Sequence, residues 1–172
     1  MDSLTYLIIL RLLHITCGVF WAGATIYLAA FVSPAVKALG PDGGKFMQQL
    51  AKTNKLPLVM TIAATTNIVA GILLLWKLSN GFQYDWMISK HGLVLNGGVS
   101  LGIIAYLEGL LVTRTTILKI NALGAQLAGG GPPSQEQLQL MNGYRQKVIT
   151  ANNIAASLLA VTVISMSLVR YL

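Results

Sequence analysis

The sequence predicts an all-α integral membrane protein, a four-helix up-down bundle with short amphipathic helices on its cytoplasmic side. Hydrophobic residues make up 55% of the 172 residues and charged residues only 10%, whereas a soluble domain carries about 25% charged residues. Four apolar stretches reach the roughly 20 residues that a membrane-spanning helix needs. This length suits one compact bundle, so residues 1–172 are expected to form a single domain.

Four membrane spans are expected, in the order of the chain. They cover residues 4–33, 57–76, 91–113 and 148–169. Pro34 is expected to end the first span, which is longer than a bilayer is thick and should tilt or protrude. Pro57 opens the second span in the first helical turn, where the missing N–H of proline costs nothing.

The three connections predict different structures. Residues 35–56 contain the amphipathic stretch KFMQQLAKTNK, which predicts a short surface helix. Residues 77–90 form a short aromatic loop that suits the lipid headgroup level. Residues 114–147 should continue the third helix into water and break at GGGPP. The chain should then restart at Ser134, where Gln137 completes a capping box that leads into the fourth helix.

The distribution of lysine and arginine predicts the orientation in the membrane. Eight lie in the first and third connections: Lys37, Lys45, Lys52, Lys55, Arg114, Lys119, Arg145 and Lys147. Four lie toward the other side: Arg11, Lys77, Lys90 and Arg170. Cytoplasmic loops carry the excess of basic residues, so both termini are expected outside, in a bacterial inner membrane. This asymmetry accounts for the net charge of +7, and no nucleic-acid partner is expected.

The two histidines of the chain stand at the head of stripes of small residues. The stripe on the first helix is Arg11, His14, Gly18, Ala22 and Thr25. The stripe on the third helix is His91, Gly98, Gly102, Ala105 and Gly109. In an up-down bundle these two helices are parallel and can face each other across the core. Intramembrane ionisable residues are expensive and usually functional, which makes both histidines candidate site residues.

Two interpretations of the stripes stay open. Small residues allow helices to pack closely in membranes. Alternatively, glycine-sized positions accommodate the faces of a haem and the imidazoles bind its iron. In the second interpretation His14 and His91 are the axial ligands, and the haem is non-covalent haem b because no CxxCH motif is present. His14 lies roughly 10 Å deeper in its span than His91. If helix tilt does not absorb this difference, Met166 on the fourth helix is the fallback ligand.

Several polar residues accompany the stripes. Arg11 lies one turn before His14, where it either pairs with a haem propionate or extends to the headgroups. Lys90 and Arg170 are similar candidates at the same surface. Glu108 lies about 25 Å from His91 by helical rise and is expected to pair with Arg114 or Lys147, with a role in a proton path as the alternative. Asn67 is expected to form interhelical hydrogen bonds.

The stretch RLLHITCGVFWAGATIYLAAFVSPAV, residues 11–36, resembles the opening helix of a group of small bacterial membrane proteins. The group includes copper-resistance-D-like proteins, the membrane domain of a bacterial urate oxidase and HemJ-type protoporphyrinogen oxidases. The resemblance rests on a histidine followed by a Gly/Trp/Gly pattern, here His14, Gly18, Trp21 and Gly23. It implies a four-helix bundle that holds haem b with His14 as a ligand. HemJ-type proteins also have a basic residue at the start of the third helix, and Lys90 resembles that position.

Three functions follow as expectations. The leading one is a b-type cytochrome that passes electrons between a quinone or lipophilic reductant and an outer redox partner protein. The second is a haem-dependent membrane oxidoreductase that acts on a porphyrinogen-like substrate, which requires an open coordination position. The third is a cofactor-free membrane subunit or small transporter whose stripes only pack helices. The remaining expected partners are the lipid bilayer and, in a homodimer, a second copy of the chain.

Overall fold

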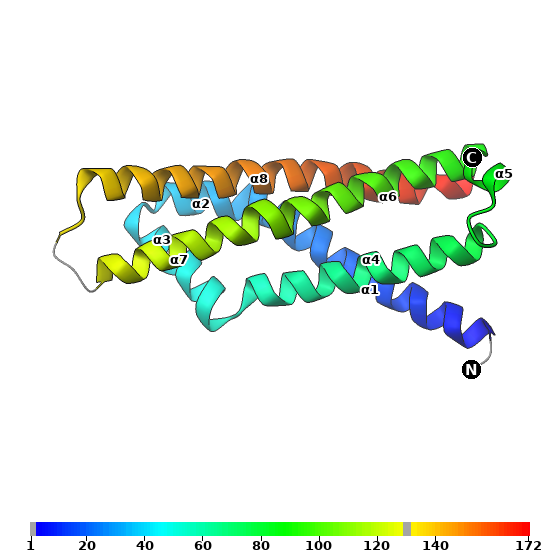
Figure 1. Ribbon diagram of the computed structural model, residues 1–172, viewed down its shortest axis with the longest axis horizontal. Helices are drawn as coiled ribbons and strands as arrows, with labels where there is room; N and C mark the ends of the chain where they lie inside the picture. Colours follow the sequence, from blue (N-terminus) through cyan, green and yellow to red (C-terminus); the bar gives the residue numbers. More distant parts are fainter. Residues whose placement is uncertain (1–2, 129–131) are drawn as a thin grey trace.

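The computed structural model describes residues 3–128 and 132–172, and this part of the chain is helical without strands. Four helical stretches, Leu4–Ala38, Leu56–Leu78, Lys90–Leu127 and Gln135–Tyr171, are long and apolar enough to cross a membrane. The expected all-α class and the four apolar helices are therefore confirmed. Figure 1 shows that α1 begins and α8 ends at the same end of the molecule, which we call the termini end.

The first long helix does not end at Pro34, and this prediction was wrong. Helix α1 (Ser3–Tyr27) passes through a π-helical turn (Leu28–Val32) directly into α2 (Ser33–Ala38). In the π turn the Ser33 N–H bonds to the carbonyl of Leu28, five residues earlier. Pro34 then lies in the first turn of α2, where a missing N–H is tolerated. The change of helix type just before the proline allows the helix to continue.

The second long helix is α4 (Leu56–Leu78), with Pro57 in its first turn as predicted. The third consists of α6 (Lys90–Glu108), a π turn (Gly109–Thr113) and α7 (Arg114–Ala128), so the predicted continuation beyond the third span is confirmed. The predicted break at GGGPP falls partly on residues 129–131, outside the described residues.

The fourth long helix, α8 (Gln135–Leu168), is about 50 Å long by helical rise, and a short 3₁₀ turn (Val169–Tyr171) follows it. The predicted capping box begins α8. The Ser134 hydroxyl accepts a hydrogen bond from the Gln137 N–H at 3.2 Å, and the Gln137 side chain accepts one from the Ser134 N–H at 2.9 Å. These bonds satisfy two backbone donors that a helix start leaves open.

The shorter connections are helical as well. The predicted amphipathic segment forms α3 (Pro41–Gln48) and a π turn (Gln49–Thr53), which run obliquely across the long axis toward the start of α4 (Figure 1). The aromatic loop at the termini end contains a single helical turn, α5 (Tyr84–Met87). Asn80 and Phe82 adopt positive φ angles of 49° and 63° in this tight loop.

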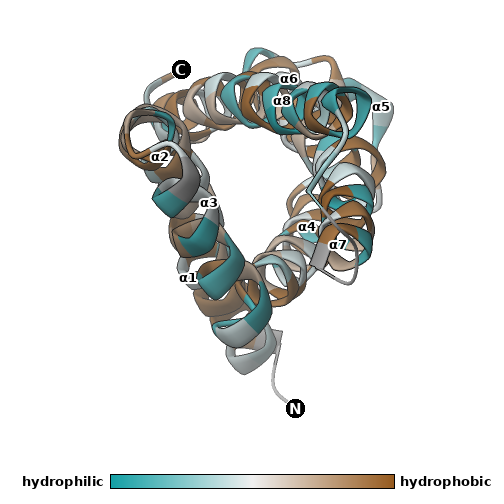
Figure 2. Cartoon of the chain, turned by 90° about the vertical axis from the view of Figure 1, so that its left-hand side faces the viewer, coloured by the Kyte–Doolittle hydropathy of each residue, from teal (hydrophilic) through white to brown (hydrophobic). Residues whose placement is uncertain are grey.

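The long helices pack as two pairs, α1 with α4 and α6 with α8, and α1 also contacts α8. Viewed along the axis, they surround a common centre (Figure 2). All four helices contribute buried side chains to one cluster, which we call the central layer: Trp21, Ala22, Ala64, Ala105 and Leu159. The Trp21 and Tyr106 rings meet edge to face at 6.4 Å beside it. The Tyr106 hydroxyl bonds to the Thr65 hydroxyl at 2.8 Å and so links α6 to α4.

Candidate functional site

His14 on α1 is held against α4 by the backbone and side chain of Asn67. The Nδ1 atom of His14 lies 3.0 Å from the Asn67 backbone oxygen, and the Asn67 side-chain amide donates to the His14 backbone oxygen at 2.6 Å. His14 is half-buried and Asn67 is buried. The expected interhelical role of Asn67 is therefore confirmed, and its partner is the histidine that heads the first stripe.

The contacts of His14 with Asn67 favour one tautomer of the imidazole. A carbonyl oxygen only accepts hydrogen bonds, so the 3.0 Å contact is a hydrogen bond when Nδ1 carries the hydrogen and donates it to Asn67. In a neutral imidazole the other nitrogen then has a lone pair. No hydrogen bond among the described residues uses Nε2 of His14. The imidazole thus presents an unoccupied ligand atom.

Two glycines make this close approach between α1 and α4 feasible. A β-carbon at Gly71 would lie 2.8 Å from Cε1 and 3.0 Å from Nδ1 of His14. A β-carbon at Gly18 would lie 2.6 Å from the amide nitrogen of Asn67. Each helix therefore has a glycine opposite the polar side chain of the other. Gly18 of the first stripe serves this packing, and Gly71 belongs to neither predicted stripe.

His14 shares its depth in the bundle with one residue on each of the other three long helices. His14, Gly71, Gly98 and Met166 each lie seven residues from the central layer, toward the termini end. Seven residues correspond to about 10 Å of helical rise. The Met166 Cε atom would lie 3.6 Å from a β-carbon at Gly98. The fallback ligand Met166 is thus level with His14.

The structure does not place His91 at this level. His91 is exposed in the first turn of α6 and lies fourteen residues, about 20 Å of rise, from the central layer. The depth difference of about 10 Å between the two histidines, counted in the sequence, is therefore retained. Helix α6 also packs mainly against α8 rather than α1.

The glycines of the second stripe contact α8. A β-carbon at Gly98 would lie 3.2 Å from Cβ of Ser165, and one at Gly102 would lie 3.6 Å from Cγ2 of Thr162. The Thr162 hydroxyl shares its hydrogen between the Leu158 carbonyl at 2.9 Å and the Gly98 carbonyl at 3.3 Å. In this structure Gly98 and Gly102 therefore have the geometry of close helix packing.

The basic candidates stay on the surface, and the predicted partner of Glu108 is wrong. Arg11 and Lys90 are exposed. Glu108 accepts a hydrogen bond from the Thr113 hydroxyl at 2.8 Å, across the π turn of the third long helix. Within residues 3–128 and 132–172 it forms no ion pair with Arg114 or Lys147. Because the π turn places Thr113 within reach, the carboxylate is satisfied by its own helix.

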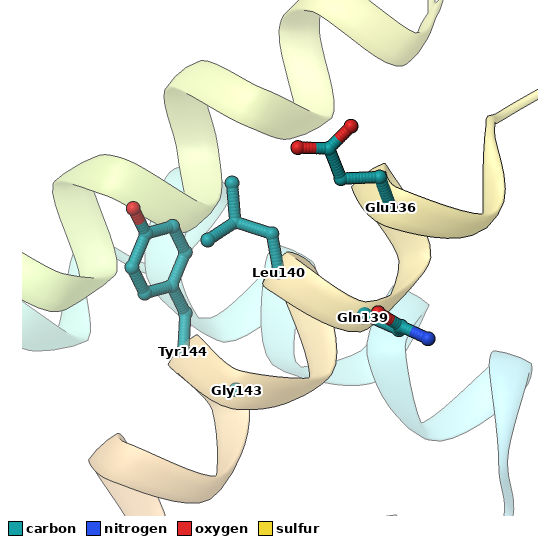
Figure 3. Close-up of a pocket in the computed structure, with 5 residues that line it drawn as sticks. All are labelled: Glu136, Gln139, Leu140, Gly143 and Tyr144. Atoms are coloured by element: carbon teal, nitrogen blue, oxygen red, sulfur yellow. The ribbon is translucent and has the colours of Figure 1, made fainter.

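The two described surface pockets lie away from His14. One is lined by Trp76, Lys77, Asn80 and Gly81 in the loop after α4. The other is lined by five residues on the first half of α8: Glu136, Gln139, Leu140, Gly143 and Tyr144 (Figure 3). Figure 3 shows Leu140 and Tyr144 pointing toward α7, and the Lys119 ammonium lies 5.9 Å from the Tyr144 ring centre. These pockets bring together none of the residues that the sequence predicted as ligands.

The donor set limits the kind of metal group that fits. No group of three or more His, Cys, Asp or Glu side chains lies close enough to bind a metal ion in the part of the chain that the structure describes. A zinc or copper ion needs several protein ligands. A haem supplies four ring nitrogens itself and needs only one or two axial ligands. The Nε2 atom of His14 offers one nitrogen ligand, the number that a haem requires at the least.

Comparison of the chain with protein-family models, curated proteins and solved structures finds no match.

Proposed function

We propose that the chain is a membrane-embedded, up-down four-helix bundle that binds haem b, with Nε2 of His14 as an axial ligand of the iron. The observation that carries the proposal is the hydrogen bond from Nδ1 of His14 to the Asn67 backbone oxygen. Histidines that bind metals commonly donate their second nitrogen to a carbonyl or carboxylate, which fixes the tautomer and increases the basicity of the ligand atom. His14 has this arrangement within an apolar helix.

The second axial position is assigned from depth. Met166 is level with His14, whereas His91 is exposed about 10 Å further toward the termini end. A second side chain would have to lie at the depth of His14 to hold the same haem, so this register favours Met166 over His91. A methionine thioether opposite a histidine is an established haem ligand pair that raises the reduction potential.

The proposed role in electron transfer follows from the haem that these residues would hold. A bound haem b supplies reversible one-electron chemistry. His14 would hold the iron of such a haem through Nε2. Arg11 lies one turn closer to the surface than His14 and is exposed, where its guanidinium can pair with a propionate. We infer electron transfer between a quinone or other lipophilic reductant and a partner protein at the termini end.

The orientation supports an outer redox partner. The eight basic residues in the connections at the opposite end favour a cytoplasmic position for that end. The termini end, with His14 in the nearer half of the bundle, then faces the outside of a bacterial inner membrane. A quinone in the bilayer and a protein outside it can both approach this half.

A second function is favoured by the packing of Gly98 and Gly102 against α8. If the glycines serve packing alone, the chain is a cofactor-free membrane subunit. The absorbance spectrum of the detergent-purified full chain separates the two functions. A Soret band that shifts on reduction with dithionite supports the haem protein. A colourless protein that also takes up no added haemin supports the cofactor-free subunit.

A further inference from the structure

Asn67 makes three contacts with His14 that involve both its backbone and its side chain. The backbone oxygen accepts from Nδ1 at 3.0 Å, and the side-chain amide donates to the His14 backbone oxygen at 2.6 Å. The amide nitrogen also lies 3.2 Å from Nδ1. We propose that Asn67 is a positioning residue that locks His14 in the Nδ1–H tautomer and directs the Nε2 lone pair to a ligand.

The fixed tautomer of His14, which we call the lock, depends on the side chain of Asn67, although the atom that accepts from Nδ1 is the Asn67 backbone oxygen. The amide fastens the backbone of α1 at His14 to α4, and this sets the distance over which Nδ1 reaches the carbonyl. Asn67 is only 8% exposed, so water competes little for its bonds, and an unpaired buried amide would be costly. If the amide is removed, α1 is no longer held at this point of α4, and we expect the bond from Nδ1 of His14 to the Asn67 carbonyl to be lost.

The alternative tautomer is disfavoured by the same geometry. If Nε2 carried the hydrogen, the lone pair of Nδ1 would face the carbonyl oxygen of Asn67 at 3.0 Å. The second hydrogen of the amide, whose nitrogen lies 3.2 Å from Nδ1, could donate to it in that form, but the carbonyl oxygen is the closer of the two atoms and would then face a lone pair. In free histidine the Nε2–H form predominates, so a locked Nδ1–H form requires an imposed environment.

The role of this lock in haem binding rests on the proposed function, but the lock itself can be measured without haem. The chain contains two histidines, so ¹⁵N labelling of the imidazoles gives few signals, and the His91→Ala variant assigns them. Protonated and unprotonated imidazole nitrogens resonate far apart in ¹⁵N NMR spectra. In the haem-free full chain in detergent, at a pH where both rings are neutral, we expect His14 to show one fixed Nδ1–H tautomer. The exposed His91 should show averaged signals and serves as an internal reference.

Two variants test the part played by the Asn67 side chain. Asn67→Leu keeps the backbone carbonyl and removes the amide, so His14 should change to averaged signals like those of His91. Asn152→Leu replaces a half-buried asparagine on α8 and should leave His14 unchanged. An averaged or Nε2–H signal for His14 in the unmodified chain would overturn the inference, as would a fixed Nδ1–H signal in Asn67→Leu. A locked His14 in a protein that takes up no haemin would instead contradict the proposed function alone.

Discussion

His14 on α1 and Gly71 on α4 are so close that a β-carbon at Gly71 would lie 2.8 Å from Cε1 of the imidazole. The imidazole can occupy this position only because residue 71 has no side chain. The two residues are separated by 57 positions in the sequence, and only the packing of α1 against α4 brings them together.

Gly71→Ala should displace the imidazole and lower the haem content of the purified protein. A core residue that is too large costs about 1–3 kcal/mol, which cancels or outweighs the roughly 1 kcal/mol that alanine gains over glycine within a helix, so we expect no net gain in stability. Thermal unfolding in detergent and haem per chain measure the two effects. Gly23→Ala is the matched control, because no atom lies within 4 Å of a β-carbon at Gly23. Equal haem content in both variants would contradict the assigned role of Gly71.

Met166→Leu tests the second axial ligand. Leucine keeps an apolar side chain of similar volume against Gly98 but removes the thioether. We expect the spectrum to change from a six-coordinate low-spin form to a five-coordinate form, because His14 remains bound. His91→Ala should leave the spectrum unchanged. An unchanged spectrum in Met166→Leu together with a five-coordinate spectrum in His91→Ala would make His91 the ligand despite its exposed position.

Ser134→Ala should loosen the start of α8 and leave the rest of the bundle intact. Loss of an N-cap hydroxyl costs about 1 kcal/mol, which corresponds to roughly fivefold faster opening. Amide hydrogen exchange in the first turn of α8 should accelerate by about that factor. Ser157→Ala removes a hydroxyl that bonds only to the Asn153 carbonyl in the same helix and should not affect this turn. Unchanged exchange in Ser134→Ala would mean that the capping box contributes little.

The orientation is tested by reporters fused after Leu172. Eight basic residues flank one end of the bundle and four flank the other, so the C-terminus should lie outside the cytoplasm. Alkaline phosphatase should be active at this position, and a fluorescent protein that matures only in the cytoplasm should stay dark. The same reporters placed after Asn54, between α3 and α4, should give the reverse result. A fluorescent C-terminal fusion would invert the orientation and move the redox partner to the cytoplasm.

The sequence predicted elements whose signals are local. Apolar length revealed the four long helices, and the Ser134–Gln137 spacing revealed the capping box. The continuation of the first helix through Pro34 was missed because a π turn has no distinct signal in residue types. His14 was found because a histidine in an apolar span is conspicuous, but its contacts depend on the register between α1 and α4.

That register explains which site residues the sequence could not identify. Asn67 was expected to bond between helices without a known partner, and Gly71 was not singled out. The sequence does contain the same spacing on both helices, because His14 precedes Gly18 and Asn67 precedes Gly71 by four residues each. This pattern places a polar side chain and a glycine one turn apart on both helices. The depth of His91, by contrast, could be counted from the sequence, and in the structure His91 still lies about 10 Å from the level of His14.

Binding of haem iron by Nε2 of His14 is tested by the absorbance spectrum of His14→Ala beside that of the unmodified chain. Both are purified in detergent after equal membrane insertion and then exposed to haemin. We expect a Soret band that shifts on reduction in the unmodified chain and loss of most bound haem in His14→Ala. Equal haem content and identical spectra in the two proteins would contradict this expectation.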